Sequence, residues 1–81
     1  MLQEFKLELE RALHIIRWEP TNDELLRIAQ DISRFKPALS SDLSVIVLQV
    51  CPKIGRLINE GQDNSDLRLL LAIATAVATE A

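Results

Sequence analysis

The chain has 81 residues, a net charge of −3, one cysteine and one histidine. This composition excludes an internal disulfide and a structural zinc site. The acidic balance disfavours nucleic acid, whose binding domains usually carry clustered basic residues. The N-terminal residues lack a signal-peptide pattern, and no apolar stretch reaches the ~20 residues of a membrane span. We expect a single cytoplasmic domain over residues 1–81 that binds no cofactor and no membrane.

The first predicted helix covers residues 2–18. Its apolar side chains recur three and four residues apart, which places them on one face of a helix. These side chains are Leu2, Phe5, Leu9, Ala12, Leu13 and Ile16. The helix should end at Glu19-Pro20, because a residue that precedes proline is disfavoured in the α region.

The second predicted helix begins at Thr21 and ends at Lys36-Pro37. Thr21 and Glu24 match a capping box, in which each side chain bonds to the backbone N–H of the other residue. The apolar face of this helix comprises Leu25, Ile28, Ala29, Ile32 and Phe35. We therefore expect Phe35 in the core with the four residues that precede it on that face.

The segment from Ser41 to Glu60 admits two interpretations. The run from Val45 to Val50 is rich in β-branched residues and resembles a buried strand. However, the sequence has no second strand-like run to pair with it, and the apolar spacing of a helix continues past Pro52. We predict one helix over 41–60 that begins at the Ser40-Ser41-Asp42 cap, is kinked or broken at Pro52, and stops at Gly61.

The last predicted helix covers residues 67–81 and follows Asn64 or Ser65 as its N-cap. Arg68 and Glu80 are its only ionisable side chains. Its large apolar residues cover an arc of roughly 200° around the helix, which is wider than a surface helix requires. This helix should therefore occupy the centre of the domain or contact a second molecule.

Together these elements predict an all-α fold, a compact antiparallel bundle of four helices with the third kinked or broken at Pro52. The predicted connections are about three to five residues long, which favours antiparallel neighbours. In this arrangement the 67–81 helix packs centrally against the apolar faces of the other three.

No group of residues matches a catalytic or metal-binding motif. His14 lies beside charged residues but has no nucleophile in its helix, so an exposed histidine without a catalytic role is the simpler interpretation. Cys51 lies in the most apolar stretch, which favours a buried and unreactive thiol. The Asp63–Asp66 run lacks the ligand spacing of a calcium loop and suits a helix cap. We expect no enzymatic activity.

Two surfaces are candidate partner interfaces. On the first helix, Leu7, Arg11, His14 and Trp18 project away from the apolar face. Tryptophan and arginine are common at the energetic centres of interfaces. Alternatively, Trp18 folds back over the turn and covers the second helix. On the last helix, a strip of small or polar side chains would admit a close helix approach, and it consists of Arg68, Ala72, Thr75, Ala76 and Thr79.

Surplus apolar surface without catalytic motifs predicts a non-catalytic protein–protein interaction module, either an adaptor or a small regulator. Its partner would be another protein or a second copy, in which case an isologous homodimer is expected. One alternative is a nucleic-acid-associated transcriptional regulator that uses scattered basic residues, namely Arg27, Arg34, Lys36, Lys53 and Arg56. Another alternative is a small-ligand site, which requires a cavity beside Cys51 and Pro52.

Overall fold

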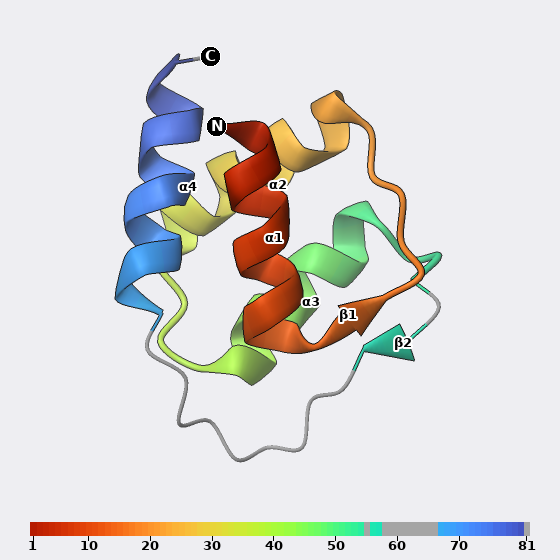
Figure 1. Cartoon of the computed structure of the whole chain (residues 1–81). Helices are drawn as coiled ribbons and strands as arrows, with labels where there is room; N and C mark the ends of the chain where they lie inside the picture. The colour runs from red at the N-terminus through yellow and green to blue at the C-terminus, as the bar shows by residue number, and fades with distance from the viewer. Residues whose placement is uncertain (55, 58–66, 81) are drawn as a thin grey trace.

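The computed structural model describes residues 1–54, 56–57 and 67–80. The helices in this part of the chain are α1 (Leu2–Leu13), α2 (Asn22–Phe35), α3 (Ser40–Val50) and α4 (Arg68–Glu80). Two short strands, β1 (Ile15–Ile16) and β2 (Arg56–Leu57), pair antiparallel with Ile15 opposite Leu57. The predicted all-α bundle of four helices is confirmed (Figure 1).

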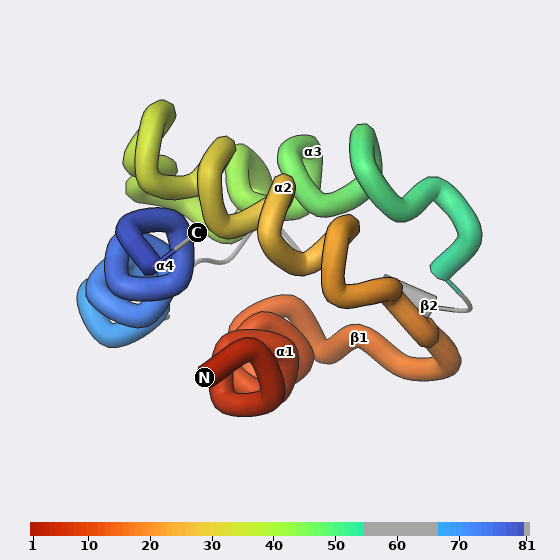
Figure 2. Tube along the Cα trace, turned by 90° about the horizontal axis from the view of Figure 1, so that it is seen from above, coloured from red at the N-terminus to blue at the C-terminus, as the bar shows by residue number. Residues whose placement is uncertain are grey.

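The helices form two pairs that cross each other. Figure 2 shows α1 and α4 nearly end-on, whereas α2 and α3 run across the view. α2 contacts the three other helices, while α4 lies at one edge and packs mainly on α2 and α1. The prediction that the 67–81 helix is central is therefore wrong. One side of α4 is buried through Leu70, Ala74 and Val77, and its opposite side faces outwards.

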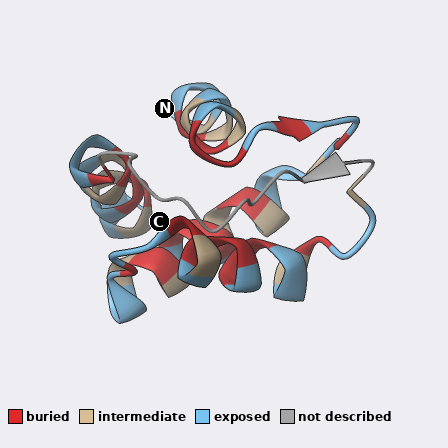
Figure 3. Ribbon diagram, turned by 90° about the horizontal axis from the view of Figure 1, so that it is seen from below, coloured by how far each residue is buried: buried red, intermediate tan, exposed pale blue. Residues whose placement is uncertain are grey.

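The core lies between these helices, where their buried sides face one another (Figure 3). Its largest fully buried side chains are Phe5, Leu9, Leu13, Ile28, Ile32, Leu43, Val47 and Leu70. Complete burial of such a side chain stabilises the folded state by about 1.5–3 kcal/mol. The apolar faces predicted for the first two helices are therefore largely confirmed. The exceptions are their last positions, because Ile16 is 47% exposed and Phe35 is 63% exposed.

Helix α1 ends at Leu13, before the predicted end at Trp18. His14 adopts φ 53° and ψ 46°, which is a left-handed conformation, and its backbone N–H donates to the Glu10 carbonyl. The chain then extends through β1, which pairs with β2. The predicted helix was too long because this strand partner comes from a distant part of the sequence, which local spacing does not reveal.

Both ends of α2 agree with the prediction. At its start, the Glu24 N–H donates to the Thr21 hydroxyl at 3.1 Å, and the Thr21 N–H donates to the Glu24 carboxylate at 2.8 Å. These two bonds form the capping box. At its end, Lys36 takes a left-handed conformation with φ 48°, and its N–H donates to the Ile32 carbonyl.

Helix α3 includes the Val45–Val50 run, so the helical interpretation of that run is confirmed. It ends at Val50, and the prediction of one helix over 41–60 is wrong because Arg56–Leu57 form β2. Cys51, which precedes a proline, has φ −124° and ψ 80°, outside the α region.

Helix caps later in the chain follow a different pattern from the one predicted. α3 begins at Ser40, and Leu39 occupies the N-cap position without a side-chain bond. α4 begins at Arg68. The predicted stop at Gly61 and the predicted caps Asn64 and Ser65 lie outside the described residues.

Candidate protein-interaction surfaces

The outer face of α4 carries no charge beyond Arg68 until the end of the helix. Ala72 and Thr75 are exposed on this face, and Leu69 is 56% exposed. The hydroxyls of Thr75 and Thr79 donate to carbonyl oxygens one turn earlier, at 2.9 and 2.7 Å. Because these donors are satisfied within the helix, the face behaves as a largely apolar surface.

The outer face of α1 brings together three of the predicted interface residues. Leu7 is 52% exposed, and Arg11 and His14 are also exposed one and two turns further along. The Arg11 guanidinium pairs with Glu8 on the same helix. This face therefore presents one large apolar side chain among polar ones.

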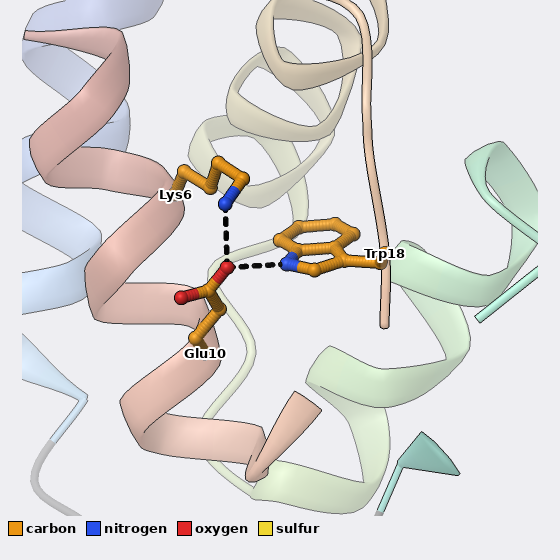
Figure 4. Close-up of polar contacts among 3 residues, drawn as sticks. All are labelled: Lys6, Glu10 and Trp18. Atoms are coloured by element: carbon orange, nitrogen blue, oxygen red, sulfur yellow. Dashed lines mark hydrogen bonds and ion pairs between the residues drawn. The ribbon is translucent and has the colours of Figure 1, made fainter. Parts of the chain in front are cut away.

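Trp18 does not belong to that face. The residue is only 6% exposed, and its Nε1–H donates to the Glu10 carboxylate at 2.7 Å. The same carboxylate oxygen accepts a bond from the Lys6 ammonium at 2.7 Å (Figure 4). Trp18 therefore folds back into the protein's own core, so an exposed Trp18 anchor is ruled out. Its hydrogen bond is to α1, whereas the alternative interpretation expected it to cover the second helix.

The bonds around Glu10 also set its acidity. Burial alone would raise the pKa of Glu10, but the bonds from Lys6 and Trp18 and the Lys6 charge outweigh it. The pKa therefore lies below its ordinary value of 4.5. An ionised Glu10 thus holds the indole against α1 at neutral pH.

Two hollows flank Trp18. One of 640 Å³ lies along Ile15–Glu19, and one of 370 Å³ lies beside Cys51 and Pro52. The structure therefore has a hollow beside Cys51 and Pro52, where a small-ligand site would require one. Two of its polar groups already bond to the protein, however, because the Glu24 carboxylate bonds to Thr21 and to the Cys51 thiol.

Cys51 is buried, with 8% of the residue exposed, as predicted from its apolar surroundings. Burial, and then the negative charge and hydrogen bond of Glu24, raise the pKa of Cys51 to about 11. The thiol is therefore protonated at neutral pH, and a protonated thiol is a poor nucleophile.

A third hollow, of 520 Å³, lies where α2 turns into α3. We call it the hairpin groove, and its lining residues are Phe35, Lys36, Pro37, Ala38, Asp42, Val45, Ile46 and Gln49. Phe35 and Val45 are 63% and 55% exposed, although their apolar character suggested the core. Ile46 also lines the groove and is buried. Sequence reasoning missed this surface, and the available signal was the helix-ending Lys36-Pro37 pair directly after Phe35.

Charged side chains of both signs border the hairpin groove. Lys36, at the end of α2, and Asp42, in the first turn of α3, are exposed and line the groove. Within the described part of the chain, neither residue has an ion-pair partner. The Arg34 guanidinium lies 5.8 Å from the centroid of the Phe35 ring, within reach of a cation–π interaction.

Three of the basic residues considered for nucleic acid, Arg34, Lys36 and Lys53, do not gather on one face. Arg34 and Lys36 lie at the last turn of α2, whereas Lys53 lies in the hollow beside Glu24, at the first turn. A helix of 14 residues separates these positions by roughly 20 Å. Lys53 also shares its two hollows with Glu10, Glu19 and Glu24. This dispersal among carboxylates weighs against a nucleic-acid surface.

The described residues show neither a metal site nor a membrane-spanning helix. In the described residues, no group of three or more acidic, histidine or cysteine side chains is arranged to hold a metal ion. None of the described helices has the length and apolar character needed to cross a membrane. Comparison with known proteins finds no matching family model, no matching curated protein and no matching solved structure.

Proposed function

We propose that this chain is a non-catalytic protein–protein interaction module and that the hairpin groove is its contact site. The observation that carries the proposal is the exposure of Phe35, which is 63% exposed at the edge of a 520 Å³ hollow. Aromatic side chains are enriched at the centres of protein interfaces, where they fill pockets on the partner.

The distribution of apolar and polar residues in the groove is typical of a protein-binding surface. Its base is apolar through Ile46 and Pro37, both buried. Its edges are polar through Lys36, Asp42 and Gln49. An apolar centre with a polar rim is the usual anatomy of such interfaces.

The other exposed apolar surfaces are weaker candidates for the contact site. The outer face of α4 consists mainly of alanine and threonine, with Leu69 as its one large exposed side chain. The outer face of α1 offers Leu7 alone. Energetic centres of interfaces favour large, well-packed side chains, so the hairpin groove is the better candidate.

The test is a selection of random displayed peptides on the purified wild-type chain. Selected peptides are then measured against Phe35→Gln and against the matched control Leu69→Gln, whose residue is similarly exposed on α4. We expect peptides that bind the wild type and the Leu69→Gln variant, with at least about tenfold weaker binding to Phe35→Gln. Circular dichroism verifies that both variants are folded.

Two results would contradict the proposal. One is a selection that enriches no peptide. The other is a set of peptides that bind the Phe35→Gln variant as tightly as the wild type, because their contact site would then lie elsewhere.

A further inference from the structure

We propose that the partner of the hairpin groove is a second copy of this chain, joined through the same groove in an isologous dimer. This inference rests on the proposed function, because it uses the same contact site. It is carried by the arrangement of charge around the groove.

The groove is lined by one basic and one acidic side chain, which come from different helices, together with apolar side chains. Lys36 lies on the α2 side and Asp42 on the α3 side, with Phe35 and Val45 exposed in the same hollow. Neither charge is paired within the described chain, so each can take a partner from outside.

A twofold axis through the apolar centre makes this pattern complementary to itself. In an isologous interface, if residue i of one copy contacts residue j of the other, then j of the first contacts i of the second. Lys36 of each copy then faces Asp42 of the other, and the two Phe35 rings meet near the axis. A partner with a uniformly acidic or basic surface would face a like charge at one edge.

The charges that line the hairpin groove also permit self-association through it. The whole chain carries a net charge of −3, so two copies repel each other weakly in general. The lysine and aspartate that line the groove cancel. The groove is therefore a surface at which two copies approach without a net charge penalty.

The expected dimer is weak. Stable specific interfaces bury about 800 Å² on each partner. The 11-residue helix α3 is only about 16 Å long, so the hairpin face falls towards the small end of that range. We expect an equilibrium that depends on concentration rather than a permanent dimer.

The test is sedimentation velocity on the full chain from about 10 μM to about 1 mM. The wild type should shift from its monomer mass of 9.1 kDa towards twice that value. Lys36→Asp alone makes both groove edges acidic, and Asp42→Lys alone makes both basic. Each variant should dimerise at least about tenfold more weakly, because like charges then face each other.

An equimolar mixture of the two variants provides the decisive measurement. Every facing pair in the mixed dimer is again of opposite sign, so the mixture should associate although neither variant does so alone. A merely structural effect of the substitutions would not be repaired by mixing. Arg27→Asp, an equal charge change on α2 outside the groove, should dimerise like the wild type.

A wild type that stays monomeric over the whole range overturns the second-copy proposal. A dimer that is insensitive to the charge changes, or a mixture that does not associate, also overturns it. Peptides that depend on Phe35 in the display experiment would in each case leave the proposed function standing. The two proposals can therefore fail separately.

Discussion

Trp18 and Phe35 are two aromatic residues near helix ends, and the fold treats them in opposite ways. Trp18 lies between β1 and α2, is 6% exposed, and bonds to Glu10. Phe35 is the last residue of α2 and is 63% exposed. Their positions on a continuous helical wheel suggest the reverse. An apolar helix face therefore predicts burial only where the helix itself continues and where neighbouring elements cover that face.

Trp18 is buried and Phe35 is exposed for different reasons. α1 ends at Leu13, so the chain can turn and lay the indole of Trp18 back against the helix that precedes it. α2 keeps its phase up to Phe35, but the left-handed Lys36 then directs the chain away into α3. The ring is thus on the predicted side of the helix but beyond the edge of the core.

The largest expected effect is a direct contrast between these two residues. Trp18→Ala should lower the free energy of unfolding by about 3–5 kcal/mol, because it empties a buried aromatic site. Phe35→Ala should change it by only about 0.5 kcal/mol or less, because the ring is exposed. Urea unfolding followed by circular dichroism measures both variants. Equal losses in the two variants would remove the contrast.

The same contrast between covered and uncovered positions extends to α4. Ala74→Leu should lower the free energy of unfolding by about 1–3 kcal/mol, since Ala74 is fully buried and the added carbons overpack the core. Ala72→Leu introduces the same side chain on the outer face, so it should cost about 0.5 kcal/mol or less. If the Ala72→Leu change were the more costly one, the edge position of α4 would be wrong.

The smallest expected effect concerns the carboxylate that secures Trp18. Because the pKa of Glu10 is lowered in the folded state, its ionised form stabilises the fold above the ordinary value of 4.5. This contribution is lost as the pH falls through the folded-state pKa. It should stay below about 1 kcal/mol, because the ion pair is partly exposed.

The measurement is the free energy of unfolding of the wild type and of Glu10→Gln between about pH 7 and about pH 3. The advantage of the wild type should shrink towards the acidic end. Trp18→Phe keeps a ring but lacks the indole donor. In this background, the difference in the free energy of unfolding between Glu10 and Glu10→Gln should therefore decrease less as the pH falls. If the difference in the free energy of unfolding between the wild type and Glu10→Gln did not change with pH, the ionised carboxylate would not stabilise the fold.

The sequence allowed much of the fold to be predicted because its signals are local. The capping box at Thr21 and Glu24, the end of α2 at Lys36-Pro37 and the apolar spacing of Phe5, Leu9 and Leu13 all act within a few residues. The early end of α1 could not be predicted, because it accompanies the pairing of Ile15 with Leu57. Such pairing depends on the tertiary arrangement.

The candidate site was harder to predict than the fold. Exposure of Leu7 and of the α4 strip follows from helical phase, and the structure places these residues on outer faces. The hairpin groove depends instead on how two helices diverge after Lys36. Val45 shows the difficulty, because its β-branched run is typical of a core, yet Val45 is 55% exposed and lines the groove between the end of α2 and α3.

The position of the two chain ends has a practical consequence. Met1 and Glu80 line one small hollow together with Asn22, at the first turn of α2, whereas the hairpin groove begins at the last residue of that helix. A fluorophore or other label attached at Met1 or Glu80 therefore lies about 20 Å from the groove. In a dimer joined through the grooves, labels attached there would sit at the two far extremities, where their separation reports the geometry of assembly.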